Sequence, residues 1–187
     1  MTHFVKINNK KTYIDKGRLD LSSKGIQSFD KINGFLKTKD VRILDLSDNS
    51  LSSLSNLPDA FIQNNSKSLT KLYLSRNKIE KIEKIGQFFN LEELDLSHNK
   101  INKIMGLFSL ENLISLNLSK NPIEKIEGMG NLKQLKTLWL KETKINHELI
   151  DKIGGIDKEA GLVENPQNII QFCEQNKDIQ EKFEMYL

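Results

Sequence analysis

The sequence contains little cysteine, tryptophan or proline: its 187 residues include one Cys, one Trp and three Pro. Because Cys173 is the only cysteine, an intramolecular disulfide is excluded, which favours a reducing compartment. The opening residues, MTHFVKINNKKTY, lack the apolar stretch of a signal peptide, and no later run approaches the ~18 apolar residues of a membrane helix. We therefore expect a cytoplasmic protein without a membrane span.

Concentrated charge of one sign is also absent. The 28 basic and 25 acidic residues give a net charge of +3 and are spread along the chain. Nucleic-acid-binding domains usually carry their basic residues in one patch or stripe. The sequence therefore predicts no nucleic-acid partner.

Motifs for catalysis and for cofactor binding are missing as well. The histidines His3, His98 and His147 lie in different segments, without a second histidine at i+4 or a nearby Cys-x-x-Cys pair. The glycine-rich phosphate loop, the dinucleotide fingerprint and the Gly-x-Ser-x-Gly motif do not occur. We expect no catalytic residue, no cofactor and no metal ion, and hence a protein that is not an enzyme.

Two features could imitate a chemical site. Cys173 lies on the apolar side of an expected helix, where a thiol is usually buried and inert. Acidic residues recur at similar places in the chain but lack the spacing of a calcium loop, which favours a solvated face over a cation site; they are Asp45, Asp48, Glu93 and Asp95.

What the sequence does contain is a repeat. The strings LDLSDNSL, LYLSRNKI, LDLSHNKI and LNLSKNPI occupy residues 44–51, 72–79, 94–101 and 116–123. Two divergent units extend the pattern at both ends. The second leucine of each Leu-x-Leu then falls at intervals of 25, 28, 22, 22 and 22 residues, at Leu21, Leu46, Leu74, Leu96, Leu118 and Leu140. A fixed period predicts stacked units that share one core.

The full unit, L-x-x-L-x-L-x-x-N-x-I-x-x-I, resembles the leucine-rich repeat superfamily. The 22-residue units are similar to the short-repeat subfamily that includes a regulatory subunit of protein phosphatase 1. This resemblance implies an α/β solenoid, a horseshoe with about six parallel strands on its concave face. The residues themselves agree, because Leu-x-Leu alternation predicts a short strand with both leucines on one side.

An asparagine follows each central strand, at Asn49, Asn77, Asn99 and Asn121. A buried side-chain amide can satisfy backbone groups that a turn exposes, so the column predicts a structural ladder. Lys24 and Thr143 replace asparagine at the two ends, as expected for divergent terminal repeats.

We predict a single domain over residues 1–187. Residues 1–16 form an N-terminal cap with a hairpin that turns at Asn8-Asn9, 17–146 form the repeats, and 147–187 form a helical C-terminal cap. Helices are expected over 147–153, from Pro166 with Asn165 as its cap, and over 178–187. Residues 57–68 fit either a short helix or a longer connector, and we favour the connector.

The string ENPQNIIQFC, residues 164–173, resembles the segment that closes repeat domains in some Roco-type GTPases. No phosphate-binding loop accompanies it, so no GTPase module is expected here. We interpret the C-terminal segment as a cap; a helix that docks a partner is the alternative.

The strand pattern also predicts which side chains face a partner. We expect a concave binding surface formed by Trp139, Tyr73, Asp95, Asn117, Asp45, Lys71, Arg76, Glu93, His98 and Lys120. Trp139 is the expected anchor, since exposed Trp and Tyr favour interfaces. The alternative is that the C-terminal tail covers it.

We therefore expect a monomeric, non-enzymatic intracellular adaptor that binds a protein on the concave face. The resemblance implies partners such as phosphatases, motor subunits, splicing factors or small GTPases. The alternative is a recognition or regulatory subunit of an enzyme system, such as a small GTPase, a phosphatase or a ubiquitin ligase.

Overall fold

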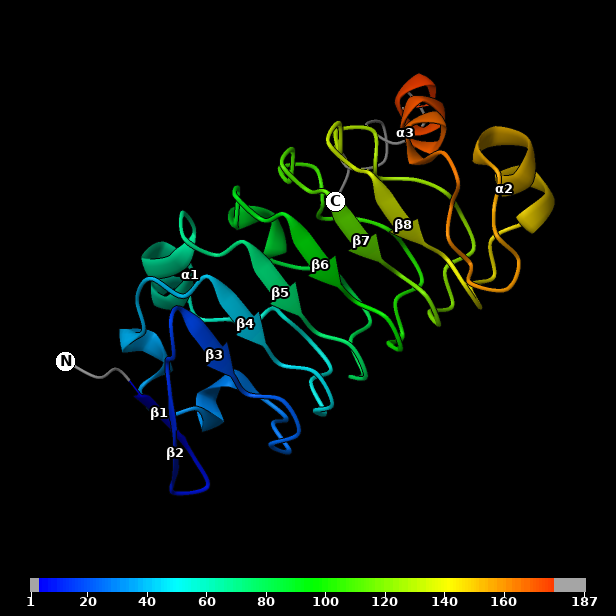
Figure 1. The fold of residues 1–187 in the computed structure, drawn as a ribbon. Coiled ribbons are helices and arrows are strands. Elements are labelled where there is room, and N and C mark those ends of the chain that lie inside the picture. Colours follow the sequence, from blue (N-terminus) through cyan, green and yellow to red (C-terminus); the bar gives the residue numbers. More distant parts are fainter. Residues whose placement is uncertain (1–3, 177–187) are drawn as a thin grey trace, which may run out of the picture.

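The computed structural model describes residues 4–176. Its main element is a parallel sheet whose six strands lie side by side in chain order, as an elongated, curved array (Figure 1). The predicted fold class, an α/β solenoid with about six parallel strands, is confirmed. The strands are β3 (Arg18–Asp20), β4 (Ile43–Asp45), β5 (Lys71–Tyr73), β6 (Glu93–Asp95), β7 (Ser115–Asn117) and β8 (Thr137–Trp139).

Each strand buries its central leucine and leaves its first and third residues half-exposed. The leucine that follows each strand is buried as well, from Leu21 to Leu140. The connecting segments supply the opposite wall of the core, for example Ile82, Phe88 and Leu107, all of them buried. The inward orientation predicted for the Leu-x-Leu leucines is therefore confirmed.

The favoured interpretation of residues 57–68 as a connector is wrong, because helix α1 (Asp59–Asn65) occupies this segment. The helix forms because Phe61 and Ile62 are buried, at 0% and 3% exposure. Phe61 continues a row of aromatic rings in the core, with centroids 4.1 Å from Phe35 and 6.2 Å from Phe88. The longer interval thus adds core contacts where a bare connector would add none.

The asparagine ladder is present. Nδ2 of Asn77 donates to the Leu46 carbonyl of the preceding repeat (2.9 Å) and to the Leu74 carbonyl of its own (3.1 Å). Its Oδ1 accepts from the Leu51 amide at 3.0 Å. The same pattern recurs at the other ladder positions, so each buried amide joins two neighbouring repeats; these are Asn49, Asn99 and Asn121.

A second set of asparagines, which the sequence reasoning did not identify, lies at the surface. Asn90 donates to the Lys67 carbonyl and Asn112 to the Phe89 carbonyl, each at 2.9 Å. Both bonds reach 23 residues back, into the preceding repeat. Like the ladder, these bonds join neighbouring repeats, but each of these asparagines makes a single side-chain bond that is exposed to water.

Both ends of the sheet carry the expected caps (Figure 1). Strands β1 (Phe4–Ile7) and β2 (Lys10–Tyr13) form an antiparallel hairpin whose turn residues Asn8 and Asn9 have positive φ. At the other end lie α2 (His147–Gly154) and α3 (Pro166–Gln175). The exact division at residues 16 and 146 stays a prediction.

One detail of the C-terminal cap differs from expectation. Asn165 makes no side-chain cap bond to α3: its backbone, with φ −128° and ψ 84°, lies outside the extended conformation usual for an N-cap, and its N–H donates to the Gly154 carbonyl (2.8 Å). The side chain that caps a helix is Asn146, which accepts from the amides of Glu148 and Leu149 at the start of α2. The helix expected over 178–187 lies outside the described residues. Within the described part, no helix combines the length and apolarity that a bilayer crossing needs.

Candidate functional site

The concave face of the sheet presents three rows of side chains. The first residues of the strands form the leading row: Arg18, Ile43, Lys71, Glu93, Ser115 and Thr137. The third residues form the central row: Asp20, Asp45, Tyr73, Asp95, Asn117 and Trp139. Three residues further on, the turn row contains Ser23, Asp48, Arg76, His98, Lys120 and Glu142. The register places neighbours within a row about 4.8 Å apart.

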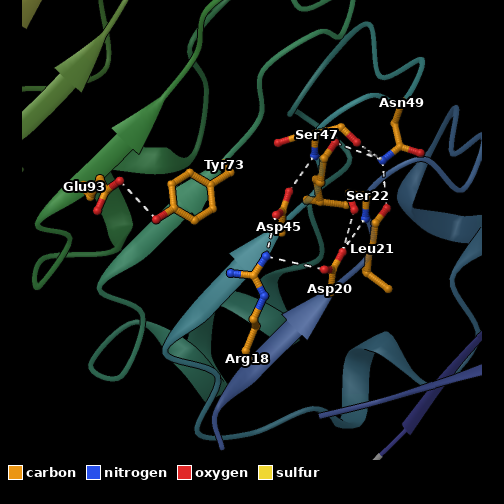
Figure 2. A network of polar contacts seen from close by, with 10 residues as sticks. Arg18, Asp20, Leu21, Ser22, Asp45, Ser47, Asn49, Tyr73 and Glu93 are labelled. Carbon is orange, nitrogen blue, oxygen red and sulfur yellow. Dashed lines mark hydrogen bonds and ion pairs between the residues drawn. The ribbon is translucent and has the colours of Figure 1, made fainter. Parts of the chain in front are cut away.

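At the N-terminal end of this face, charges are already paired. Nη2 of Arg18 donates to Oδ2 of Asp45 at 2.8 Å and to Oδ2 of Asp20 at 3.4 Å (Figure 2). Ser22 donates to Oδ1 of Asp20 through its hydroxyl (2.6 Å) and its amide (3.0 Å). The hydroxyl bond, with smaller contributions from the amide and Arg18, lowers the pKa of Asp20, although partial burial opposes it.

Further along, Glu93 joins two of the predicted site residues. Its Oε1 accepts from the Tyr73 hydroxyl at 3.0 Å, and its Oε2 lies 2.7 Å from Nζ of Lys71 (Figure 2 shows the tyrosine bond). Burial and then the bond to Glu93 raise the pKa of Tyr73, and the bond to Glu93 raises the pKa of Lys71. The structure thus brings Lys71, Tyr73 and Glu93 together in one cluster.

The turn row has an unusual backbone. All six of its residues have positive φ, between 53° and 56°. Asp48 and Arg76 form an ion pair at 3.8 Å, and Lys120 and Glu142 form one at 3.6 Å. His98 lies between the two pairs; burial, followed by the charges of Lys120 and Arg76, lowers its pKa.

Asp95, Asn117 and Trp139 follow one another in the central row, and we call these three residues the central strip. Oδ1 of Asp95 accepts from the Ser97 amide (2.8 Å), and Oδ1 of Asn117 accepts from the Ser119 amide (3.1 Å). The rows contain six carboxylates, and within residues 4–176 Asp95 is the one without an ion pair.

Trp139 is half-buried, and the C-terminal tail meets its strand at the edge. The Leu140 amide donates to the Gly161 carbonyl and the Val163 amide to the Leu138 carbonyl, both at 2.8 Å. Leu162 therefore pairs with Trp139 in antiparallel fashion, and the two side chains stand on the same face. The tail extends the sheet beside Trp139 and contributes Leu162 as its neighbour.

Sequence reasoning missed two interactions on this face. It did not predict the pairing of Arg18 with Asp45, although the register places the two residues on adjacent strands. It also missed that Asp or Asn two residues before a serine accepts from the serine amide, as at Asp45 and Ser47 (3.1 Å). The recurring Asp-Leu-Ser sequence could have predicted this hydrogen bond.

Cys173 is 3% exposed, and burial raises the pKa of its thiol to about 11, which keeps it protonated at neutral pH. In the described part of the chain, no three His, Cys, Asp or Glu side chains gather closely enough to hold a metal ion.

Comparisons with known proteins agree with the geometry of the sheet. Leucine-rich repeat family models match residues 67–123 and residues 40–64. A leucine-rich repeat protein of Leptospira interrogans is 31% identical, with a TM-score of 0.59 over 71% of this chain and 33% of its own. An internalin, inlF, of Listeria monocytogenes is 24% identical, with a TM-score of 0.59 over 74% of this chain and 39% of its own. A search of curated proteins found no significant match.

The chain thus spans well under half of the length of these two structures. The more specific resemblances, to the 22-residue subfamily and of residues 164–173 to Roco-type proteins, stay predictions. The repeat models, the parallel register and the buried asparagine ladder agree on one architecture: the chain folds as a leucine-rich repeat solenoid.

Proposed function

We propose that this protein is a non-enzymatic adaptor that binds a partner protein on the concave face of its sheet, inside the cell. Repeat solenoids offer an extended, preformed surface, and leucine-rich repeat domains in general mediate protein–protein interaction. We propose the concave face in particular as the binding surface.

The contrast between the paired charges of the concave face and its central strip is the observation that carries this proposal. Outside the strip, the charged groups of Arg18, Lys71 and Glu93 already have partners within the chain. Within the strip, Asp95 has no ion pair among the described residues, and Trp139 offers a large, half-exposed aromatic surface. Binding energy concentrates in such aromatic anchors with desolvated neighbours.

The central strip also indicates what the partner presents. A carboxylate, an amide and an indole follow one another at ~4.8 Å spacing, which suits a basic side chain that pairs with Asp95 and stacks on Trp139. We therefore expect Asp95→Asn to weaken binding and to reduce its dependence on salt. The variant keeps the shape and the bond from the Ser97 amide, so an unchanged affinity and salt dependence would remove the basic group from the proposal.

Site-specific photo-cross-linking tests the face and captures the partner in the same experiment. A benzophenone amino acid is placed at Ser115, on the concave face, and as a control at Glu111, an exposed residue in the connection between β6 and β7. Light-induced products formed in the native cell are identified by mass spectrometry. The proposal expects a discrete adduct from position 115 that position 111 does not give; the opposite pattern contradicts it.

The identity of the captured protein also decides the alternative function. A small GTPase captured only in one nucleotide state, or a phosphatase or ubiquitin ligase subunit, favours a recognition or regulatory subunit of that enzyme system. A structural or motor protein favours the adaptor.

A further inference from the structure

The N-terminal hairpin carries a second exposed surface that the concave face does not explain. Four of its side chains, Phe4, Lys6, Lys11 and Tyr13, are exposed, and cross-strand pairing joins Phe4 to Tyr13 and Lys6 to Lys11. The aromatic rings lie 5.7 Å apart, and Nζ of Lys11 lies 4.6 Å from the centre of the Phe4 ring. One face of the hairpin is thus both aromatic and cationic.

The backbone of the hairpin has one open edge. Two-residue turns with positive φ at both positions make Ile7 and Lys10 a hydrogen-bonded pair, so the peptide groups of Lys6 point away from β2. They bond to Asn33 instead, at 2.8 and 2.9 Å. By the same alternation, the peptide groups of Lys11 and Tyr13 point to the far edge of β2. Within residues 4–176 these groups have no hydrogen-bond partner.

The positive charge of the hairpin determines which kind of strand can pair with the open edge of β2. Lys6, Lys10 and Lys11 are exposed, and none of them forms an ion pair with a carboxylate in residues 4–176. Lysines along an edge strand oppose pairing with a second neutral or basic strand, but they attract an acidic one. Nucleic acid fits less well, because the edge offers peptide groups in a strand spacing and the face contains no arginine.

We propose that β2 is a docking edge for an extended acidic peptide segment of a partner protein, which adds to the hairpin as a third strand. The peptide bonds to the amide and carbonyl of Lys11 and Tyr13. The side chains that it presents on the face of Lys11 and Tyr13 are acidic, with one carboxylate beside Lys11, and its alternate apolar side chains lie on the other face, beside Thr12. This surface is separate from the concave face, so its failure leaves the function proposed above unaffected.

The test measures fluorescence anisotropy of a labelled heptapeptide, Glu-Val-Glu-Val-Glu-Val-Glu, titrated with the whole chain. The control probe is the same peptide with its central valine replaced by proline, which cannot complete the ladder. The proposal expects saturable binding of the first peptide, at least about tenfold tighter than that of the second. Equal binding of the two peptides would overturn it, as would preferential binding of a labelled oligothymidine.

A matched pair of substitutions separates the backbone edge from the charge. Lys11→Ala and Lys11→Pro both remove the lysine, but only proline removes the outward N–H, which the hairpin itself does not use. We expect Lys11→Ala to weaken binding several-fold and Lys11→Pro to weaken it by a further factor of about ten. Circular dichroism and a thermal melt verify that each variant is folded. If folded Lys11→Pro binds as Lys11→Ala does, the edge is not used.

Discussion

The side-chain amide of Asn99 donates to the carbonyl of Leu74, 2.9 Å away in the preceding repeat. The same nitrogen lies 3.0 Å from the Leu96 carbonyl of its own repeat, and Oδ1 accepts from the Ile79 amide at 2.9 Å. One buried side chain therefore holds together two units that are each too small to fold alone. The ladder therefore links a residue pattern within each repeat to the stacking of the repeats.

The ladder predicts the cost of losing one of its members. Asn99→Ala leaves buried carbonyl and amide groups without partners, and we expect the free energy of unfolding to fall by about 1–3 kcal/mol. Asn90→Ala is the control, because it removes one inter-repeat bond that is exposed to water; we expect at most about 0.5 kcal/mol. Urea unfolding of both variants checks the difference. Equal losses would refute a special role of the buried column.

Close packing between repeats predicts a second contrast. Gly106 has φ +76°, and a Cβ there would lie 2.3 Å from the carbonyl oxygen of Ile82. Gly25 has φ +67°, but a Cβ there would meet no atom within 4 Å. We expect Gly25→Ala to cost about 1 kcal/mol through backbone strain alone, and Gly106→Ala to cost at least about 2 kcal/mol. Thermal melts compare the two, and a Gly106→Ala melt no lower than that of Gly25→Ala contradicts the packing argument.

His98 predicts a pH dependence of stability. Its pKa in the folded chain lies below the ordinary value of 6.5, so the unfolded chain binds the proton first as the pH falls. Stability that is complete above pH 6.5 is therefore lost as the pH drops through 6.5 towards the lower folded pKa. His98→Asn keeps a residue that tolerates positive φ and removes this titration. Urea midpoints at pH 7.5 and 5.5 should differ less for the variant; an equal difference would exclude His98 as the cause.

Much of this fold could be predicted from the repeat sequence. The period fixes the strands, the alternation fixes which leucines are buried, and the asparagine column fixes the turn that follows. Ion pairs between residues of the same row could also have been predicted from the strand register, since Lys71 lies opposite Glu93. The Arg18–Asp45 ion pair was harder to predict, because it connects two different rows and depends on the length of the arginine side chain.

The helix α1 shows where sequence reasoning failed. Residues 57–68 contain both helix and loop signals, and the deciding factor is tertiary: Phe61 fills a gap between Phe35 and Phe88. Such a contact cannot be read from local propensity. The predicted cap at Asn165 also failed, because this residue, which donates its N–H to the distant Gly154 carbonyl, does not adopt the backbone conformation of an N-cap.

The affinity of the cross-linked partner for Trp139→Ala, measured by calorimetry against wild type, tests the central claim most directly. The matched control is Phe89→Ala, which truncates an aromatic that is 51% exposed in the connection between β5 and β6. If the partner is held by the concave face, Trp139→Ala weakens binding by about 2 kcal/mol, or roughly thirtyfold, while Phe89→Ala leaves it unchanged. Wild-type affinity in folded Trp139→Ala, or a loss confined to Phe89→Ala, would contradict the account.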